Sequence, residues 1–149
     1  SFDAAVSAMA LMDMAEIEPL FKALIKIIRP RGCFIFAVQH PCFNSMHSSM
    51  GAELIENEKD FYTEYYIKVK GYLKPSQKPG LALQNQPQPH IYFHRPLHSL
   101  LNIAFKFGFV LDGLEEPAFS PELTAENYGI NWRRFSEIPP VIVARLRII

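Results

Sequence analysis

The sequence predicts an α/β fold with a mostly parallel sheet, and three consecutive segments carry this prediction. Phe2 to Ser7 is a short apolar run with the length of a buried strand. Apolar residues between Ile17 and Ile28 then recur at the three- and four-residue spacing of an amphipathic helix. Cys33 to Gln39 is a second apolar strand. A strand, a helix and a strand in this order form a βαβ unit, which implies parallel strands covered by a helix.

The residues around this first helix predict its two ends. Asp13 and Glu16 form a D-x-x-E pattern, so Asp13 is expected to cap the helix rather than to contact a ligand. The run Arg29-Pro30-Arg31-Gly32 is expected to end it, because proline cannot continue the amide ladder and glycine favours the turn that follows.

Regular structure is predicted again near the C-terminus. Pro96 is expected to open a second helix and Gly108 to close it. Phe109 to Leu114 and Val141 to Ile149 are read as two further strands. The last strand alternates apolar residues with two arginines, so it should have one covered face and one partly wet face.

Residues 43–95 lack this regularity and are expected to form a lid or a substrate-binding insertion. Lys78-Pro79-Gly80 is a turn signal, and Gln84 to Pro89 is expected to be an extended linker. Only Phe61 to Tyr72 is rich enough in aromatic and β-branched residues to predict a hairpin or short lid element.

Composition limits the classes of function. A formal net charge of +0 without any basic run argues against a nucleic-acid partner. No apolar run approaches the roughly 20 residues that cross a bilayer, so no membrane partner is expected. Cys33 and Cys42 are too few for a disulfide framework, which fits a reducing cytoplasm. We expect residues 1–149 to be a single cytoplasmic domain.

Five stretches together carry a family resemblance. FDAAVSAMALMDM, EIEPLFKALIKIIRPRG and CFIFAVQHPCF resemble the fourth strand, the following helix and the fifth strand of class I S-adenosylmethionine-dependent methyltransferases. HRPLHSLLNIAFKFGFVLDGLEEP resembles the helix and sixth strand of a bacterial, mostly uncharacterised subgroup, and PPVIVARLRII resembles the closing antiparallel strand. The resemblance implies a partial Rossmann-like methyltransferase fold with an antiparallel last strand. It also implies S-adenosylmethionine as cofactor of the intact protein and methyl transfer to a small-molecule acceptor.

The sequence departs from that family at its cofactor-binding elements. The glycine-rich turn after the first strand and the acidic residue after the second are missing, and Arg31 stands where a glycine is usual. We therefore expect a C-terminal methyltransferase fragment that lacks the N-terminal strands and is inactive on its own. The edge of the strand from Phe2 to Ser7 should then form a homodimer or associate with the missing half. The alternative is a non-catalytic α/β module that associates through this edge.

The resemblance also predicts which residues contact the cofactor and the acceptor. Ser7, Ala8 and Met9 carry over as cofactor contacts, although they could simply pack at the strand end. Aromatic residues of the insertion, with Tyr92 among them, could cover an acceptor beside Phe43 or form a small core of their own.

Two histidines are candidate catalytic residues. His40 follows the fifth strand and could act as a general base, or it could hydrogen-bond the backbone of its loop. His94 and Arg95 are a second pair, in which Arg95 could grip a carboxylate or phosphate of the acceptor. An ion pair of Arg95 with Glu115 or Glu116 is the favoured alternative.

A zinc site is the weakest hypothesis. Its ligands would be Cys42, His47, His90 and His94, but their spacing does not match a known zinc motif, so no metal is expected.

Overall fold

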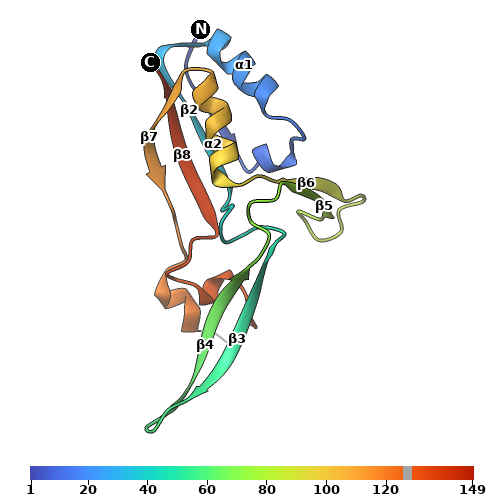
Figure 1. The fold of residues 1–149 in the computed structure, drawn as a ribbon, viewed down its shortest axis with the longest axis vertical. Helices are drawn as coiled ribbons and strands as arrows, with labels where there is room; N and C mark the ends of the chain where they lie inside the picture. The colour runs from blue at the N-terminus through green and yellow to red at the C-terminus, as the bar shows by residue number, and fades with distance from the viewer. Residues whose placement is uncertain (126–128) are drawn as a thin grey trace.

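The computed structural model describes residues 1–125 and 129–149, and its centre is a four-stranded sheet in the order β1-β2-β8-β7 (Figure 1). Its strands are β1 (Phe2–Ala8), β2 (Ile28–Gln39), β7 (Phe109–Glu115) and β8 (Val141–Ile148). The helices are α1 (Glu18–Ile27) and α2 (Leu97–Lys106), accompanied by the short 3-10 helices η1 (Leu11–Asp13), η2 (Pro121–Ala125) and η3 (Trp132–Arg134). The four strands and two helices expected around the core are therefore all present.

The direction of the strands corrects the expectation of a mostly parallel sheet. β1 and β2 are parallel, as the βαβ unit predicts, but β8 runs antiparallel to both β2 and β7. Because β8 lies between β2 and β7, it separates two strands that share a direction. Among the described residues, β1 and β2 therefore form the single parallel pair.

The start of α1 also differs from its prediction. The helix begins at Glu18, its N-cap is Ile17, and no side chain caps it. Pro19 lies in the first turn, where a missing amide costs no hydrogen bond, and this favours the later start. Asp13 is therefore not the helix cap; it ends η1 instead.

The connection from α1 to β2 is tighter than expected, because β2 begins directly at Ile28. Arg31 lies within β2 with a φ of 64°, in the left-handed region that costs most residues about 1–2 kcal/mol. Its carbonyl accepts a hydrogen bond from Nη1 of Arg147 at 2.8 Å. Arg31 thus takes the conformation that the family's glycine would adopt without strain.

One face of the sheet carries the hydrophobic core. Both helices lie on this face (Figure 1). The buried core side chains come from η1, both helices, three strands and the segments that flank α1: Leu11, Ile17, Phe21, Leu24, Ile28, Phe34, Phe36, Val38, Leu100, Ala104, Phe109, Ile142, Ala144 and Leu146. Phe21 packs edge-on against the rings of Phe34 and Phe109, which joins α1 to β2 and β7.

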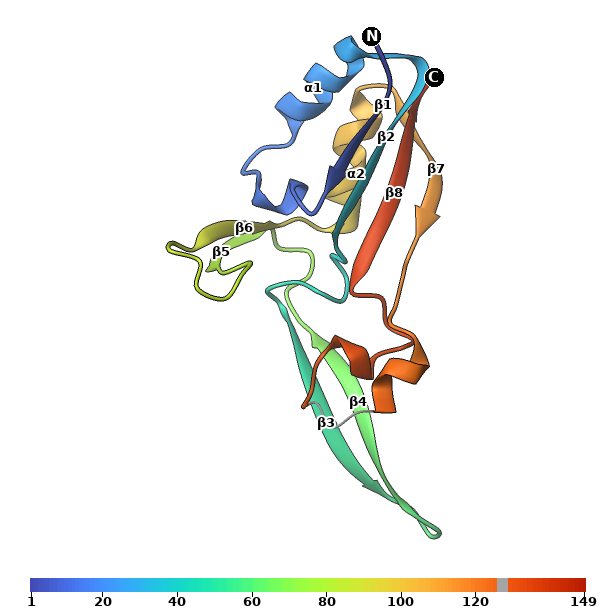
Figure 2. The same ribbon diagram turned by 180° about the vertical axis from the view of Figure 1, so that it is seen from behind.

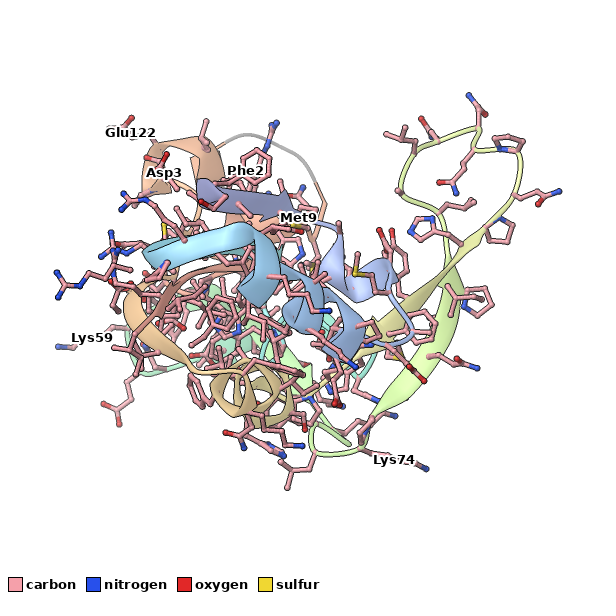
Figure 3. All side chains as sticks on the ribbon, turned by 90° about the horizontal axis from the view of Figure 1, so that it is seen from above. Phe2, Asp3, Met9, Lys59, Lys74 and Glu122 are labelled. Atoms are coloured by element: carbon pink, nitrogen blue, oxygen red, sulfur yellow. The ribbon has the colours of Figure 1, made fainter. Side chains whose placement is uncertain are left out.

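No helix covers the opposite face (Figure 2). Phe2 and Val6 of β1 are 64% and 73% exposed, and Phe2 and Met9 lie at the two ends of this strand (Figure 3). Within the described residues, β1 pairs only with β2, so its outer edge is open. Arg145 and Arg147 alternate with buried residues of β8, which confirms the predicted covered and wet faces of the last strand.

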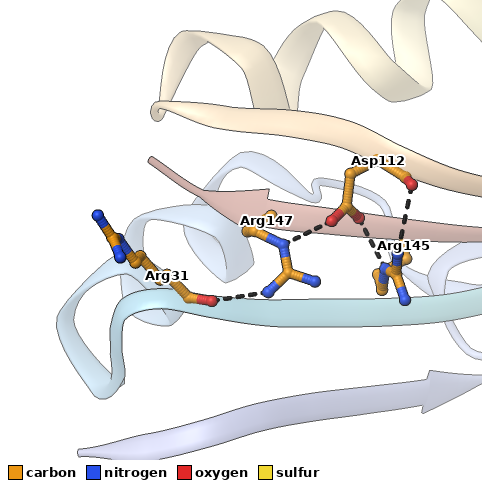
Figure 4. A network of polar contacts seen from close by, with 4 residues as sticks. All are labelled: Arg31, Asp112, Arg145 and Arg147. Atoms are coloured by element: carbon orange, nitrogen blue, oxygen red, sulfur yellow. Dashed lines mark hydrogen bonds and ion pairs between the residues drawn. The ribbon is translucent and has the colours of Figure 1, made fainter.

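A bulge in β7 places an acidic residue beside these arginines. The register with β8 shifts between Leu111 and Gly113, so Asp112 is the extra residue. Its two carboxylate oxygens accept hydrogen bonds from Nε of Arg145 and Nε of Arg147 (Figure 4). These two guanidinium groups lower the pKa of Asp112. The sequence prediction had missed this network.

Residues 43–95 contain two separate hairpins. β3 (Ser48–Glu56) pairs with β4 (Phe61–Val69), and β5 (Ser76–Gly80) pairs with β6 (His90–His94). The hairpin or lid element expected within Phe61 to Tyr72 is a single strand, β4, whose hairpin partner β3 lies upstream. Lys78-Pro79-Gly80 belongs to a strand and not to a turn. Pro79 is tolerated there because β5 lies at the edge of a two-stranded sheet. Gln84 to Pro89 lie in the loop that joins β5 to β6, not in a linker.

Candidate functional site

A cavity of about 290 Å³ lies where the carboxyl end of β2 meets η1 and the β5–β6 hairpin. This volume is close to the lower end of the range for small-molecule sites. Seventeen residues line it: Leu11, Met12, Val38, Gln39, Pro41, Asn44, Ser45, Met46, Lys78, Pro79, Gly80, Leu81, Tyr92, Phe93, His94, Arg95 and Leu100. In α/β folds, ligands bind at the carboxyl ends of the parallel strands, and this cavity lies at that edge.

Arg95 fixes one end of β6 to the segment that follows β1. Its guanidinium donates to the carbonyl oxygens of Leu11 at 3.3 Å, Ala15 at 2.7 Å and Met14. Burial lowers the pKa of Arg95. The expected ion pair with Glu115 or Glu116 is wrong, because the start of α2 faces η1 and main-chain carbonyls take the guanidinium hydrogens.

His90 lies at the other end of β6. Its Nδ1 accepts a hydrogen bond from Nε2 of Gln86 at 3.0 Å, so Nε2 carries the proton and lies 3.3 Å from Oδ1 of Asp13. The distance between these two atoms is within the range of an ion pair, but Nε2 of His90 makes no hydrogen bond within the described residues. The ring of Tyr92 stacks edge-on against His90 at 4.3 Å. Burial, together with the negative charge of Asp13, raises the pKa of Tyr92.

His94 lines the cavity with one ring nitrogen fixed. Its Nε2 donates to the carbonyl oxygen of Tyr72 at 2.7 Å, which leaves Nδ1 as the nitrogen with the lone pair. Burial lowers the pKa of His94, the Tyr72 carbonyl opposes this effect, and nearby His47 adds to the lowering. His94 is therefore neutral near pH 7, with Nδ1 able to accept a proton. The hydroxyl of Tyr72 accepts a hydrogen bond from the amide of Leu97 at 2.8 Å, so Tyr72 also supports the start of α2.

His40 lies outside the cavity lining and is only 2% exposed. Its Nδ1 accepts a hydrogen bond from the amide of Cys42, and Nε2 donates to Oε1 of Glu116 at 2.7 Å. The ring of Phe43 packs on this histidine at 4.6 Å. Proton transfer by His40 stays a prediction, but the geometry leaves neither ring nitrogen free for it. Substrate binding by Phe43 likewise stays a prediction.

The predicted cofactor residues lie at the carboxyl end of β1, next to the cavity wall formed by η1. Ser7 and Ala8 pair with Phe36 and Ala37 of β2, and Met9 follows with a φ of 53°. An exposed residue held in the left-handed region at a strand end is a common mark of a functional segment. The role of Ser7, Ala8 and Met9 stays a prediction.

The three histidines of the zinc hypothesis have other neighbours. His47 donates to or accepts from Oγ of Ser76 at 2.6 Å and stacks edge-on against His94. His90 faces Asp13, as described above. Within residues 1–125 and 129–149, no three His, Cys, Asp or Glu side chains are grouped so that they could hold a metal ion.

Tyr92, His94 and Arg95, which the sequence predicts as site residues, all line the cavity. Leu11, Met12 and Lys78 line it as well and were not predicted from the sequence. The two η1 residues followed a strand without any polar signal, and Lys78 lay in a segment that was read as a turn.

Comparison with known proteins supports the fold. No protein-family model and no curated protein matches the chain. Among solved structures, a methyltransferase from Mesorhizobium loti matches 99% of this chain with a TM-score of 0.71 and 20% identity. A putative methyltransferase from Listeria monocytogenes matches 100% of it with a TM-score of 0.70 and 19% identity. Both are described as S-adenosylmethionine-dependent, and the chain spans 62% of each.

A third structure, the glycopeptide N-methyltransferase MtfA with S-adenosyl-L-homocysteine, matches 99% of the chain with a TM-score of 0.51 and 10% identity. Residues 1–149 therefore have the fold of a portion of a class I S-adenosylmethionine-dependent methyltransferase. Among the described residues, no helix is both long enough and apolar enough to cross a bilayer.

Proposed function

We propose that this chain forms the acceptor-binding part of a methyltransferase that transfers a methyl group from S-adenosylmethionine to a small molecule. The observation that carries the proposal is the cavity at the carboxyl end of β2, lined by a histidine with one free ring nitrogen. The match in fold to methyltransferases over the whole chain supports it.

The residues present fit one side of the cofactor. Ser7, Ala8 and Met9 would contact it at the carboxyl end of β1, where the left-handed backbone of Met9 turns the chain away and the Met9 side chain is 39% exposed. S-Adenosylmethionine supplies the methyl group when bound there. The chain contains no glycine-rich turn, so these residues alone should hold the cofactor weakly.

The cavity residues would position the acceptor and remove its proton. His94 would accept that proton at Nδ1, because its Nε2 is already committed to the Tyr72 carbonyl. Arg95 would act as a positioning residue, since it holds η1 against β6 and so shapes the cavity. Positioning supplies much of the rate in a reaction of this kind.

Methyl transfer by the natural protein that contains residues 1–149 tests the proposal. The readout is tritium passing from labelled S-adenosylmethionine to a panel of small hydroxy and amino compounds. His94→Gln should lower the rate on the order of 10²-fold, the range expected for the loss of a general base. The control is His98→Gln, because His98 is exposed on α2 and hydrogen-bonds only Ser99. Equal rates for the two variants would exclude His94 as the base.

The open edge of β1 favours a second candidate function, a non-catalytic module that associates with another copy. Phe2 and Val6 are exposed beside backbone groups that pair with no strand among the described residues. Antiparallel pairing of two β1 strands would close this edge symmetrically. Sedimentation at micromolar concentration should then show a dimer that Val6→Lys dissociates. Ile25→Lys, an exposed site on α1, is the control, and a wild-type monomer would contradict the idea.

A further inference from the structure

The β5–β6 hairpin carries Lys78 and His94 on the same face, and both residues line the cavity. In the ladder, Ser76 pairs with His94 and Lys78 pairs with Tyr92. Residues two apart in a strand share a face, so Lys78 and His94 are diagonal neighbours, separated by about 7–8 Å. This spacing is comparable to the length of a small aromatic molecule.

Tyr92, which lies between these two residues on the same face, leans away from His94. A Cβ on Gly80 would come within 2.3 Å of Cε2 of Tyr92, so the ring covers Gly80. The same ring stacks against His90, at the end of β6 that is farther from His94. Because Gly80 has no side chain, the Tyr92 ring can lie over it, and the space between Lys78 and His94 stays open.

The charged side chains that line the cavity are all positive. The lining includes two cationic side chains, Lys78 and Arg95, and no aspartate or glutamate. Arg95 is engaged by three main-chain carbonyls, whereas Lys78 is exposed and forms no hydrogen bond or ion pair within the described part of the chain. Asp13, the acidic residue beside Tyr92, does not line the cavity and faces His90.

The rest of the lining combines an apolar wall with the polar side chains of Gln39, Asn44 and Ser45. Leu11 and Met12 of η1, with Leu100 of α2, form a wall of aliphatic side chains, and Phe93 adds an aromatic one. Such walls favour a flat apolar body, and the few polar groups decide its orientation.

We propose that the acceptor is a flat, apolar molecule that carries a carboxylate, with the carboxylate bound by Lys78 and the methyl-accepting group next to His94. This inference rests on the proposed function and names the substrate class of the same site. A cationic acceptor would meet the Lys78 ammonium without any lining carboxylate to balance it. Lys78 is thus the specificity-determining residue, and His94 acts on the opposite end of the acceptor.

Equilibrium binding to the 149-residue chain tests this inference without any cofactor. The probes are 6-hydroxy-2-naphthoate and its neutral counterpart 6-hydroxy-2-naphthamide, followed by their own fluorescence. The wild type should bind the anion about five- to tenfold more tightly than the amide, as expected for one charge-assisted contact. Lys78→Met should abolish this preference and Lys78→Arg should retain it. Lys74→Met is the matched control, because Lys74 is exposed, lies outside the lining and points outward (Figure 3).

The result is decisive in either direction. Equal affinity for both probes, a preference that survives Lys78→Met, or no binding of either probe would overturn the inference. Thermal unfolding of each variant shows whether a loss reflects unfolding, and retention by Lys78→Arg makes the charge itself responsible. Methylation of only neutral or cationic acceptors by the natural protein would remove this inference and leave the proposed function standing. Anion selectivity without methyl transfer would do the opposite.

Discussion

The two hairpins differ in how they are attached to the sheet. The β5–β6 hairpin is fixed beside η1 by Arg95, whose guanidinium donates to main-chain carbonyls, and His90 at the other end of β6 lies next to Asp13. The β3–β4 hairpin projects from the body of the protein (Figures 1 and 2). It leaves Leu54 and Phe61 near its tip 69% and 62% exposed. The cavity is lined by residues of the first hairpin and by none of the second.

This difference shows that strand pairing alone does not place a hairpin. β3 and β4 form the longer ladder, yet the shorter β5–β6 ladder is the one fixed against η1. The side chain of Arg95, which donates to three carbonyl oxygens of another segment, accounts for the fixed position. The residue that decides the shape of the site therefore lies directly after β6.

The largest effect is expected from Arg95→Met. It should lower the free energy of unfolding by about 2 kcal/mol, because three carbonyl oxygens lose a charged donor. Urea unfolding followed by circular dichroism measures the loss, and hydrogen exchange should become faster in β6. Lys68→Met is the matched change at the other hairpin, because Lys68 is an exposed cationic residue of β4. That loss should be about 0.5 kcal/mol or less. Equal losses would contradict the difference in attachment.

An intermediate loss of stability is expected when a glycine that is covered by a tyrosine ring is changed to alanine. Each hairpin contains one such glycine. A Cβ on Gly80 would collide with the Tyr92 ring at 2.3 Å, and one on Gly51 with the Tyr66 ring at 2.4 Å. Tyr66 is 38% exposed, so its ring can swing into solvent, whereas Tyr92 is held against His90. Gly80→Ala should therefore destabilise by about 1–2 kcal/mol and Gly51→Ala by less than about 0.5 kcal/mol. Thermal unfolding compares them, and the reverse order would show that Tyr92 is the freer ring.

The smallest effect is a dependence of the β5–β6 hairpin on pH. Burial lowers the pKa of His94 below its ordinary value of 6.5, so the folded chain binds fewer protons there than the unfolded chain. The stability from this group is present above about pH 6.5 and is lost as the pH falls from there through the lower folded value. No histidine lies between residues 48 and 69. The protection factors of the amides, which are corrected for the pH dependence of intrinsic exchange, should thus fall on acidification in β6 but not in β4, and His94→Gln should remove the difference.

The sheet and its helices could be predicted because burial of one face makes apolar residues recur at a regular spacing in the sequence. The apolar runs of β1 and β2 and the spacing within α1 depend only on which face is covered. β3 had no such period, since Gly51 and Glu53 interrupt its apolar residues. Its partner strand, from Phe61, was found because aromatic and β-branched residues dominate it. A hairpin outside the core is thus visible only when its own composition reveals it.

The site could be predicted in position but not in its contacts. Tyr92, His94 and Arg95 all line the cavity, because the segment before α2 returns to the edge where β2 ends, and their roles stay predictions. Arg95 and His94 donate to backbone carbonyls, which every residue carries, so no pattern of side chains predicts these hydrogen bonds. Asp13 was expected to cap a helix, but η1 intervenes and turns its carboxylate toward His90.

The network of Asp112, Arg145 and Arg147 makes the uncovered face of the sheet responsive to ionic strength rather than to pH. Two guanidinium groups share one carboxylate, so these three side chains keep a net positive charge. The pKa of Asp112 is lowered and that of Arg145 is raised, so this charge stays constant through the neutral range. Dissolved salt shortens the reach of such exposed charges to about 10 Å at 0.1 M. Added salt should therefore weaken the interactions of this exposed charge, while acidification acts on the cavity at His94.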